Sequence, residues 1–161
     1  MIDVRSIVSP RKAAFRRPTI GPRILSVGTA TPPRKYTQDE VLDLFQEKDP
    51  KVRSLFQSSH IDTRYLYLPD PVDGRMAEET NQGLLDRHLD GALEIGSQAI
   101  EECLEPLGLA PYDIDFLCCV STTGFVVPSL TAHLIRKMIF RENVQRIDVL
   151  GMGCNAAVNG L

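Results

Sequence analysis

The sequence predicts an α/β fold, and three observations support that prediction. Short apolar segments of strand-like composition alternate along the chain with segments of helical periodicity, a pattern typical of a sheet covered by helices. The apolar and charged fractions, 43% and 24%, are close to those of soluble globular proteins. The length of 161 residues is enough to enclose one hydrophobic core.

Charge divides the chain into two parts. The net charge of −3 gives no electrostatic argument for nucleic-acid binding. Residues 1–23 nevertheless carry a single acid against six basic residues, Arg5, Arg11, Lys12, Arg16, Arg17 and Arg23. This segment could be a targeting or phosphate-binding arm. It lacks an amphipathic period, however, so we favour a flexible basic arm that precedes a domain spanning residues 24–161.

Targeting, redox and metal signals are weak. No apolar run approaches the ~20 residues that a membrane span needs, and no signal-peptide core is present. We therefore expect a cytoplasmic protein without membrane contact. The four cysteines are expected to be reduced thiols. Because the sequence contains no CxxC pair and its histidines are scattered, we expect no metal site.

The first elements have clear boundaries. Residues 24–30 are interpreted as a short buried strand, which the prolines that follow would end. Thr37 and Glu40 have the spacing of a capping box and predict a helix with apolar residues at helical intervals. Asp49 and the proline after it indicate a second short helix.

The middle of the chain contains the longest helical pattern. Residues 64–68 are predicted to be extended, and the polar residues 69–82 are predicted to form a surface loop. A broad apolar face then indicates a helix over residues 84–105. Gly91 and Gly96 are poor helix formers, and they indicate close packing against a neighbouring element.

The last third predicts two further strands. Residues 115–120 are interpreted as a fully buried strand, followed by a turn at 121–124. Ser129 could cap a helix that extends to about residue 140, and residues 146–150 indicate another strand. A helix then begins at 155 and stops without a C-terminal cap, so we expect the natural polypeptide to continue.

Cys154 is the strongest candidate for a reactive residue. It follows Gly151-Met152-Gly153, and these glycines permit a sharp turn between strand and helix. A thiol at a helix N-terminus is expected to favour the thiolate, and backbone amides of the same turn could stabilise an oxyanion. Such a thiol suits acyl transfer from a thioester. The alternative is a small buried side chain without a chemical role.

Several segments occur in the order seen in type III polyketide synthases, the chalcone-synthase-like branch of the thiolase superfamily. They are Gly28-Thr29-Ala30, Arg64–Leu68, Cys119–Phe125 and Gly151–Ala156. The resemblance runs from about Ile24 to Leu161, so it implies the N-terminal half of a thiolase-like fold, with the C-terminal half missing. Within the family, Asp49–Ser54 and Gly151–Ala156 are similar to a branch that serves bacterial antibiotic biosynthesis.

The resemblance implies a mechanism and its partners. Malonyl-CoA would load the cysteine, and further malonyl units would condense by decarboxylative Claisen chemistry to an aromatic product. Members use no metal and no cofactor beyond the coenzyme A of their substrates, and they form homodimers. Their catalytic histidine and asparagine lie downstream of the cysteine. His60, His88 and His133 all precede Cys154 and are interpreted as surface or structural residues.

Two groups of residues carry over less firmly. Lys51 matches a cationic position that grips coenzyme A phosphates, and Arg53 lies close by. They could equally be solvated helix charges, and Ser58 stands where relatives have another basic residue.

Thr122, Thr123 and Phe125 match the lining of the reaction pocket, although the threonine hydroxyls could simply make turn contacts. Asn155 replaces the phenylalanine of chalcone synthases. That replacement argues against a phenylpropanoid starter and fits the malonyl-using branch.

Two alternatives remain. The first is a ketoacyl-carrier-protein synthase III or another thiolase relative, since these enzymes share the strand–cysteine–helix arrangement. The second is a non-catalytic truncated fragment that acts only through dimer contacts. The residues Gly151–Asn155 favour the polyketide branch.

Overall fold

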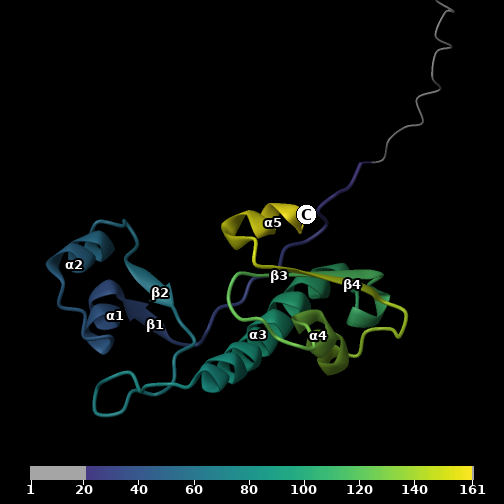
Figure 1. The fold of residues 1–161 in the computed structure, drawn as a ribbon. Helices are drawn as coiled ribbons and strands as arrows, with labels where there is room; N and C mark the ends of the chain where they lie inside the picture. The colour runs from purple at the N-terminus through teal and green to yellow at the C-terminus, as the bar shows by residue number, and fades with distance from the viewer. Residues whose placement is uncertain (1–20, 161) are drawn as a thin grey trace, which may run out of the picture.

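The computed structural model describes residues 21–160, and Figure 1 shows their arrangement. The predicted α/β class is confirmed in this part of the chain. The described elements are, in order, β1 (Lys35–Thr37), α1 (Gln38–Leu44), α2 (Pro50–Gln57), β2 (Thr63–Tyr65), α3 (Asn81–Leu104), β3 (Phe116–Ser121), α4 (Leu130–Met138), β4 (Gln145–Leu150) and α5 (Ala156–Asn159).

The first four elements form a small group of their own, on the left in Figure 1. Strands β1 and β2 are antiparallel, and helices α1 and α2 pack against each other beside them. Both predicted helix starts are confirmed. The Glu40 amide donates to Thr37 Oγ1 over 3.2 Å, the Thr37 amide donates to Glu40 Oε2 over 2.6 Å, and Asp49 accepts the Lys51 amide.

Helix α3 connects this group to the rest of the chain. Thr80 caps it by accepting the Gly83 amide, and Gly108 ends the turn after it in the left-handed conformation, with φ at 64°. The predicted close packing at Gly91 is confirmed. A Cβ atom there would lie 2.9 Å from the ring of Tyr67, and one on Gly96 would lie 3.5 Å from Leu134.

Strands β3 and β4 are parallel and form the second two-stranded sheet. Helix α4 connects them and packs against both strands and against α3, whereas α5 contacts both strands after the chain leaves β4. Buried apolar side chains come from both groups of elements: Val41, Leu42, Leu104, Leu134, Phe140 and Ala156.

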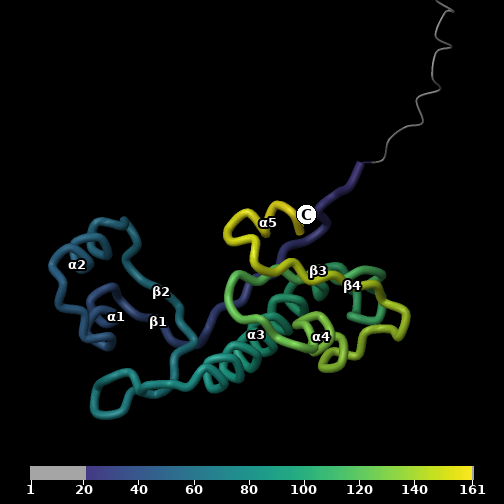
Figure 2. The backbone as a smooth tube through the Cα atoms, in the orientation of Figure 1, coloured from purple at the N-terminus to yellow at the C-terminus, as the bar shows by residue number. Residues whose placement is uncertain are grey.

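The strand predicted at residues 24–30 does not form. Figure 2 shows this stretch as a purple tube, and Ile24 is 79% exposed. A strand obtains its hydrogen bonds from a neighbouring strand, and none of the described strands pairs with it. It instead runs along α3, where the Thr29 amide donates to Glu102 and a Cβ atom on Gly28 would collide with the helix backbone at Cys103.

Two other predictions need correction. Strand β3 is not fully buried, since Phe116 is 52% exposed, because the two-stranded sheet is only partly covered by α4 and α5. Ser129 occupies the N-cap position of α4, but its side chain accepts no helix amide. The carboxylate of Asp148 takes that place and accepts the Thr131 amide over 3.1 Å.

The remaining predictions concern the N-terminal arm, metal binding, the state of the cysteines and membrane-spanning segments. The predicted arm at residues 1–23 lies almost wholly outside the described residues. Within residues 21–160 no group of three potential metal-binding side chains is found, and no helix there is long and apolar enough to span a bilayer. The four cysteines lie among the described residues as free thiols.

Candidate active site

The parallel pairing of β3 and β4 creates the candidate site. Ser121 lies opposite Leu150 at the last pair of the register, so the two strands end at the same edge of the sheet. The loop 122–125 follows β3, and the turn 151–154 follows β4. The Phe125 ring lies 3.6 Å from the position that a Cβ atom on Gly151 would occupy. Residues about 30 positions apart in sequence thus meet at one edge, where sites in open α/β sheets commonly form.

Cys154 lies at this edge and is exposed. It sits in a single 3-10 turn, Gly153–Asn155, and the positive φ angles of Gly151 and Gly153, 72° and 58°, explain why glycines occupy these two positions before it in the turn. The predicted turn between strand and helix is therefore present. The helix differs from the prediction, because it begins at Ala156 and has four described residues. The contribution of a helix dipole to the reactivity of the thiol stays a prediction.

Packing of α5 holds the cysteine turn in place. Ala156 is fully buried, and a Cβ atom on Gly160 would lie 2.6 Å from Val120 Cγ2. The helix therefore lies directly on β3, and only glycine fits at position 160. This contact ties Cys154 to the sheet although its own side chain faces solvent.

The other cysteines differ from Cys154 in environment. Cys119 lies opposite Asp148 in the β3–β4 register. Burial, followed by the negative charge of Asp148 and the neighbouring Cys118, raises the pKa of the Cys119 thiol to about 12. Cys118 and Cys103 are half-buried. Cys154 alone of the four is exposed, which distinguishes it as the thiol that a substrate can reach.

Of the residues predicted to line the reaction pocket, Phe125 reaches the turn before Cys154 at Gly151, and Thr122 and Thr123 precede it in the same loop. Thr122, Thr123 and Phe125 are exposed, and Phe125 reaches Gly151 as described above. Turn contacts are also present: the Ser121 hydroxyl donates to the Thr123 carbonyl over 2.6 Å, and the Thr123 amide donates to the same hydroxyl over 3.3 Å. These contacts shape the loop around Thr123.

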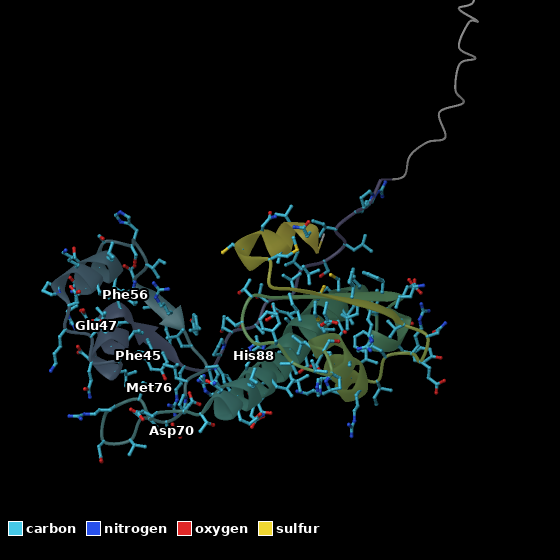
Figure 3. The ribbon with its side chains drawn as sticks, in the orientation of Figure 1. Phe45, Glu47, Phe56, Asp70, Met76 and His88 are labelled. Carbon is cyan, nitrogen blue, oxygen red and sulfur yellow. The ribbon has the colours of Figure 1, made fainter. Side chains whose placement is uncertain are left out.

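The predicted coenzyme A contacts lie elsewhere. Lys51 and Arg53 are on α2, in the group of elements that Figure 3 marks by Phe45, Glu47 and Phe56. Arg53 already donates to the Glu47 carbonyl over 3.0 Å and to Asp43 over 3.4 Å. Lys51 is exposed. The structure does not bring either side chain to the edge that carries Cys154.

A histidine that sequence reasoning treated as structural lies next to the pocket loop. His88 Nδ1 and Thr123 Oγ1 are 3.4 Å apart. His88 also lines an open groove of about 860 Å³ between α3 and residues 66–68, which includes Thr123 and Gly124 but not Cys154. A signal was available, because His88 lies three and four residues from Leu85 and Ala92 on the apolar face of the helix.

This fold and this strand–cysteine–helix edge agree with the family comparison. Residues 45–161 match the family described as FAE1/type III polyketide synthase-like protein, and the chain belongs to that family. The 3,5-dihydroxyphenylacetyl-CoA synthase of Amycolatopsis orientalis is 45% identical over 86% of this chain and 38% of its own length. The 1,3,6,8-tetrahydroxynaphthalene synthase of Streptomyces peucetius subsp. caesius is 32% identical over 99% of this chain and 44% of its own length.

Solved structures show the same fold. The crystal structure of PKS-I from the brown alga Ectocarpus siliculosus superimposes with a TM-score of 0.72 at 28% identity, over 85% of this chain and 41% of that chain. The thiolase-like fold predicted from the sequence is thereby confirmed for the part that is present. The chain spans less than half the length of the relatives that it matches.

Proposed function

We propose that this chain provides the nucleophilic part of a type III polyketide synthase that condenses malonyl-CoA units on a thioester of Cys154. The observation that carries the proposal is the exposed Cys154 at the shared end of β3 and β4, beside the loop 122–125. Membership of the family supports the reaction class. The Amycolatopsis relative supports a product of the 3,5-dihydroxyphenylacetyl-CoA type, because that compound appears in its name.

The first step is acyl transfer to sulfur. The Cys154 thiolate attacks the thioester carbonyl of malonyl-CoA, and a tetrahedral oxyanion forms. When this intermediate collapses, the bond from carbon to the coenzyme A sulfur breaks. The acyl group remains on Sγ, and coenzyme A leaves as a thiolate that takes up a proton. Backbone amides of the turn 153–155 are the nearest candidates to stabilise the oxyanion.

The second step extends the chain. Another malonyl-CoA loses carbon dioxide, and the electron pair released at its α-carbon attacks the acyl carbonyl on Cys154. The carbon–carbon bond forms as the carbon–Sγ bond breaks, so the thiolate is restored and the longer chain is carried on coenzyme A. Before each further extension, the thiolate attacks the thioester of this longer chain, so that the chain returns to Cys154 and coenzyme A leaves. After the last extension, ring closure and loss of water give an aromatic product. Thr122, Thr123 and Phe125 are proposed to line the space in which the chain grows.

We further propose that Lys51 and Arg53 help to bind the phosphates of coenzyme A and that the active protein is a homodimer. Both side chains are cationic and lie on one helix, although Arg53 is already paired. Val127, which is 94% exposed, follows the loop 122–125 and is a candidate for the subunit contact.

Mass spectrometry tests the central proposal. The protein is incubated with malonyl-CoA, quenched and digested, and the peptide that contains Cys154 is examined for the malonyl or acetyl mass. We expect that mass on Cys154, none there in Cys154→Ala, and normal loading in the matched variant Cys103→Ala, which removes a half-buried thiol on α3.

Two results would contradict the proposal. An intact, folded protein whose Cys154 gains no acyl mass from malonyl-CoA would remove the polyketide mechanism. Loading from an acyl carrier protein but not from coenzyme A esters would instead assign the chain to the ketoacyl-carrier-protein synthase III type of chemistry.

A further inference from the structure

His88 and Gly124 are in unusually close contact. Gly124 has a φ of 71°, and a Cβ atom at this position would lie 2.8 Å from His88 Cγ and 2.9 Å from His88 Nε2. Carbon atoms in ordinary van der Waals contact are ~3.5–4.0 Å apart. The imidazole therefore occupies the space that any larger side chain at position 124 would need. The backbone of the pocket loop is fitted to this ring.

A polar contact joins the same ring to Thr123, the residue before Gly124 in the loop. His88 Nδ1 lies 3.4 Å from Thr123 Oγ1, a distance at the long end of the hydrogen-bond range. The Thr123 backbone is also held by the Ser121 hydroxyl. Steric contact at one residue and a polar contact at its neighbour together restrict both the position and the orientation of the loop.

The ring itself is mounted on a well-supported helix. Arg87, adjacent to His88 on α3, donates to the Tyr67 carbonyl over 2.6 Å and pairs with Glu79. The ring of Tyr67 packs on Gly91 one turn further along the same helix. Figure 3 shows His88 on this part of α3, beneath the loop after β3. A side chain on such a support can hold a loop in one place.

The position of this loop matters at the thiol. Phe125 follows Gly124 directly, and its ring lies next to Gly151, three residues before Cys154. A movement of Gly124 would therefore move Phe125 and Thr123 relative to the sulfur. The turn 151–154 itself lies outside the groove that His88 lines.

We propose that His88 is a positioning residue, which holds the loop 122–125 against the Cys154 turn and so orients the substrate carbonyl toward the sulfur. This inference rests on the proposed acyl transfer. Small displacements of groups that position a substrate cost up to ~100-fold in rate. The ring should therefore affect transfer from malonyl-CoA, which needs an oriented carbonyl, but not alkylation by iodoacetamide, a small reagent that needs only an exposed thiolate.

Three substitutions separate positioning from packing. His88→Ala removes ring and polar atom, His88→Leu fills much of the space without a polar atom, and His88→Asn keeps a polar atom on Cγ, as in histidine. We expect malonyl transfer to Cys154 to fall about tenfold in the Ala and Leu variants and to recover substantially in the Asn variant. Alkylation of Cys154 by iodoacetamide should be unchanged in all three.

His60→Asn is the matched control, because it removes an exposed imidazole in the other group of elements at a left-handed residue, where asparagine is tolerated. This control should leave the rates of malonyl transfer and of alkylation at Cys154 unchanged. Thr123→Val provides a second approach that leaves the histidine in place. It should slow malonyl transfer, and combining it with His88→Ala should add little further loss.

The outcomes are distinguishable. If wild-type Cys154 gains no acyl mass, the proposed function fails. If the wild type is acylated but His88→Ala and His88→Leu transfer malonyl at the wild-type rate, the positioning role is overturned. It is also overturned if malonyl transfer and alkylation fall by the same factor in all three variants, because that pattern reports general loss of structure.

Discussion

Thr131 and Asp148 are joined by two hydrogen bonds, from the backbone amide and from the hydroxyl of Thr131 to the two carboxylate oxygens of Asp148. Thr131 is fully buried in the first turn of α4, and Asp148 is in β4, which ends at the candidate site. The carboxylate thus caps a helix that is 17 residues away in sequence. It ties the helix to the strand that leads to Cys154.

We expect Asp148→Ala to lower the free energy of unfolding by about 2–3 kcal/mol, because a buried amide and a buried hydroxyl lose an ionised acceptor. Chemical denaturation followed by circular dichroism measures this change. Asp62→Ala, which removes an exposed carboxylate before β2, is the control and should have little effect. An equally small effect of Asp148→Ala would show that the buried contact contributes little.

Gly124 and Gly74 provide a matched comparison at nearly the same backbone angle, with φ of 71° and 73°. Gly74→Ala meets no atom within 4 Å, so it should cost only the left-handed penalty of about 1–2 kcal/mol. Gly124→Ala also collides with the His88 ring, and we expect a further 1–3 kcal/mol, roughly the cost of overpacking. Thermal unfolding of both variants measures the difference.

One outcome would contradict the predicted difference between Gly124→Ala and Gly74→Ala. Equal destabilisation at both positions would mean that the His88 ring moves away from Gly124 at no cost. In that case the loop is not fitted to the ring, and the close contact does not determine the position of the loop.

The contact between Gly160 and Val120 predicts a size-compensation effect. Gly160→Ala places a methyl group where Val120 Cγ2 already lies, so α5 should move off β3 and the protein should lose about 1–3 kcal/mol of stability. Shortening Val120 as well, in the double variant Gly160→Ala/Val120→Ala, should restore part of the lost stability. If the double variant is no more stable than the sum of the single changes predicts, the two residues are not coupled.

Thiol reactivity should separate Cys154 from Cys119. The raised pKa of Cys119, about 12, keeps its thiol protonated at pH 8. Because the thiolate is the nucleophile, iodoacetamide at pH 8 should label Cys154 and leave Cys119 unmodified. Peptide mass spectrometry over time measures both.

The raised pKa of Cys119 also predicts how the stability of the protein changes with pH. A thiol with a raised pKa in the folded state stays protonated where the unfolded chain ionises, so its contribution to stability is lost as pH rises above the ordinary value of 9.0 toward 12.

Early labelling of Cys119 by iodoacetamide in the folded protein at pH 8 would contradict the burial that raises its pKa.

Local signals in the sequence were sufficient for most helix boundaries. Thr37 and Glu40 form their capping box within four consecutive residues, and Asp49 caps the helix that begins at the next residue. Gly108 ends the turn after α3 for an equally local reason, its left-handed backbone. Such contacts need no distant partner, so residue types and spacing determine them.

Contacts between distant residues could not be predicted in this way. The apolar stretch 24–30 has strand-like composition, yet it lies along α3, because the sequence of a strand does not specify its partner. Asp148 replaces the Ser129 side chain as the cap of α4 for a similar reason. The role of His88 depends on a loop more than 30 residues away, and only its place on an apolar helix face hinted at it.

The sequence by itself determined the α/β class, the helix starts, the glycine turn before Cys154 and the resemblance to condensing enzymes, since each depends on neighbouring residues or on motif order. The tertiary structure decided that Cys154 is the exposed thiol, that Phe125 of the loop 122–125 lies against Gly151 in the turn before it, and that Lys51 and Arg53 lie on a helix away from it. The physical reason is the parallel pairing of β3 with β4, which brings the ends of two separate strands to one edge.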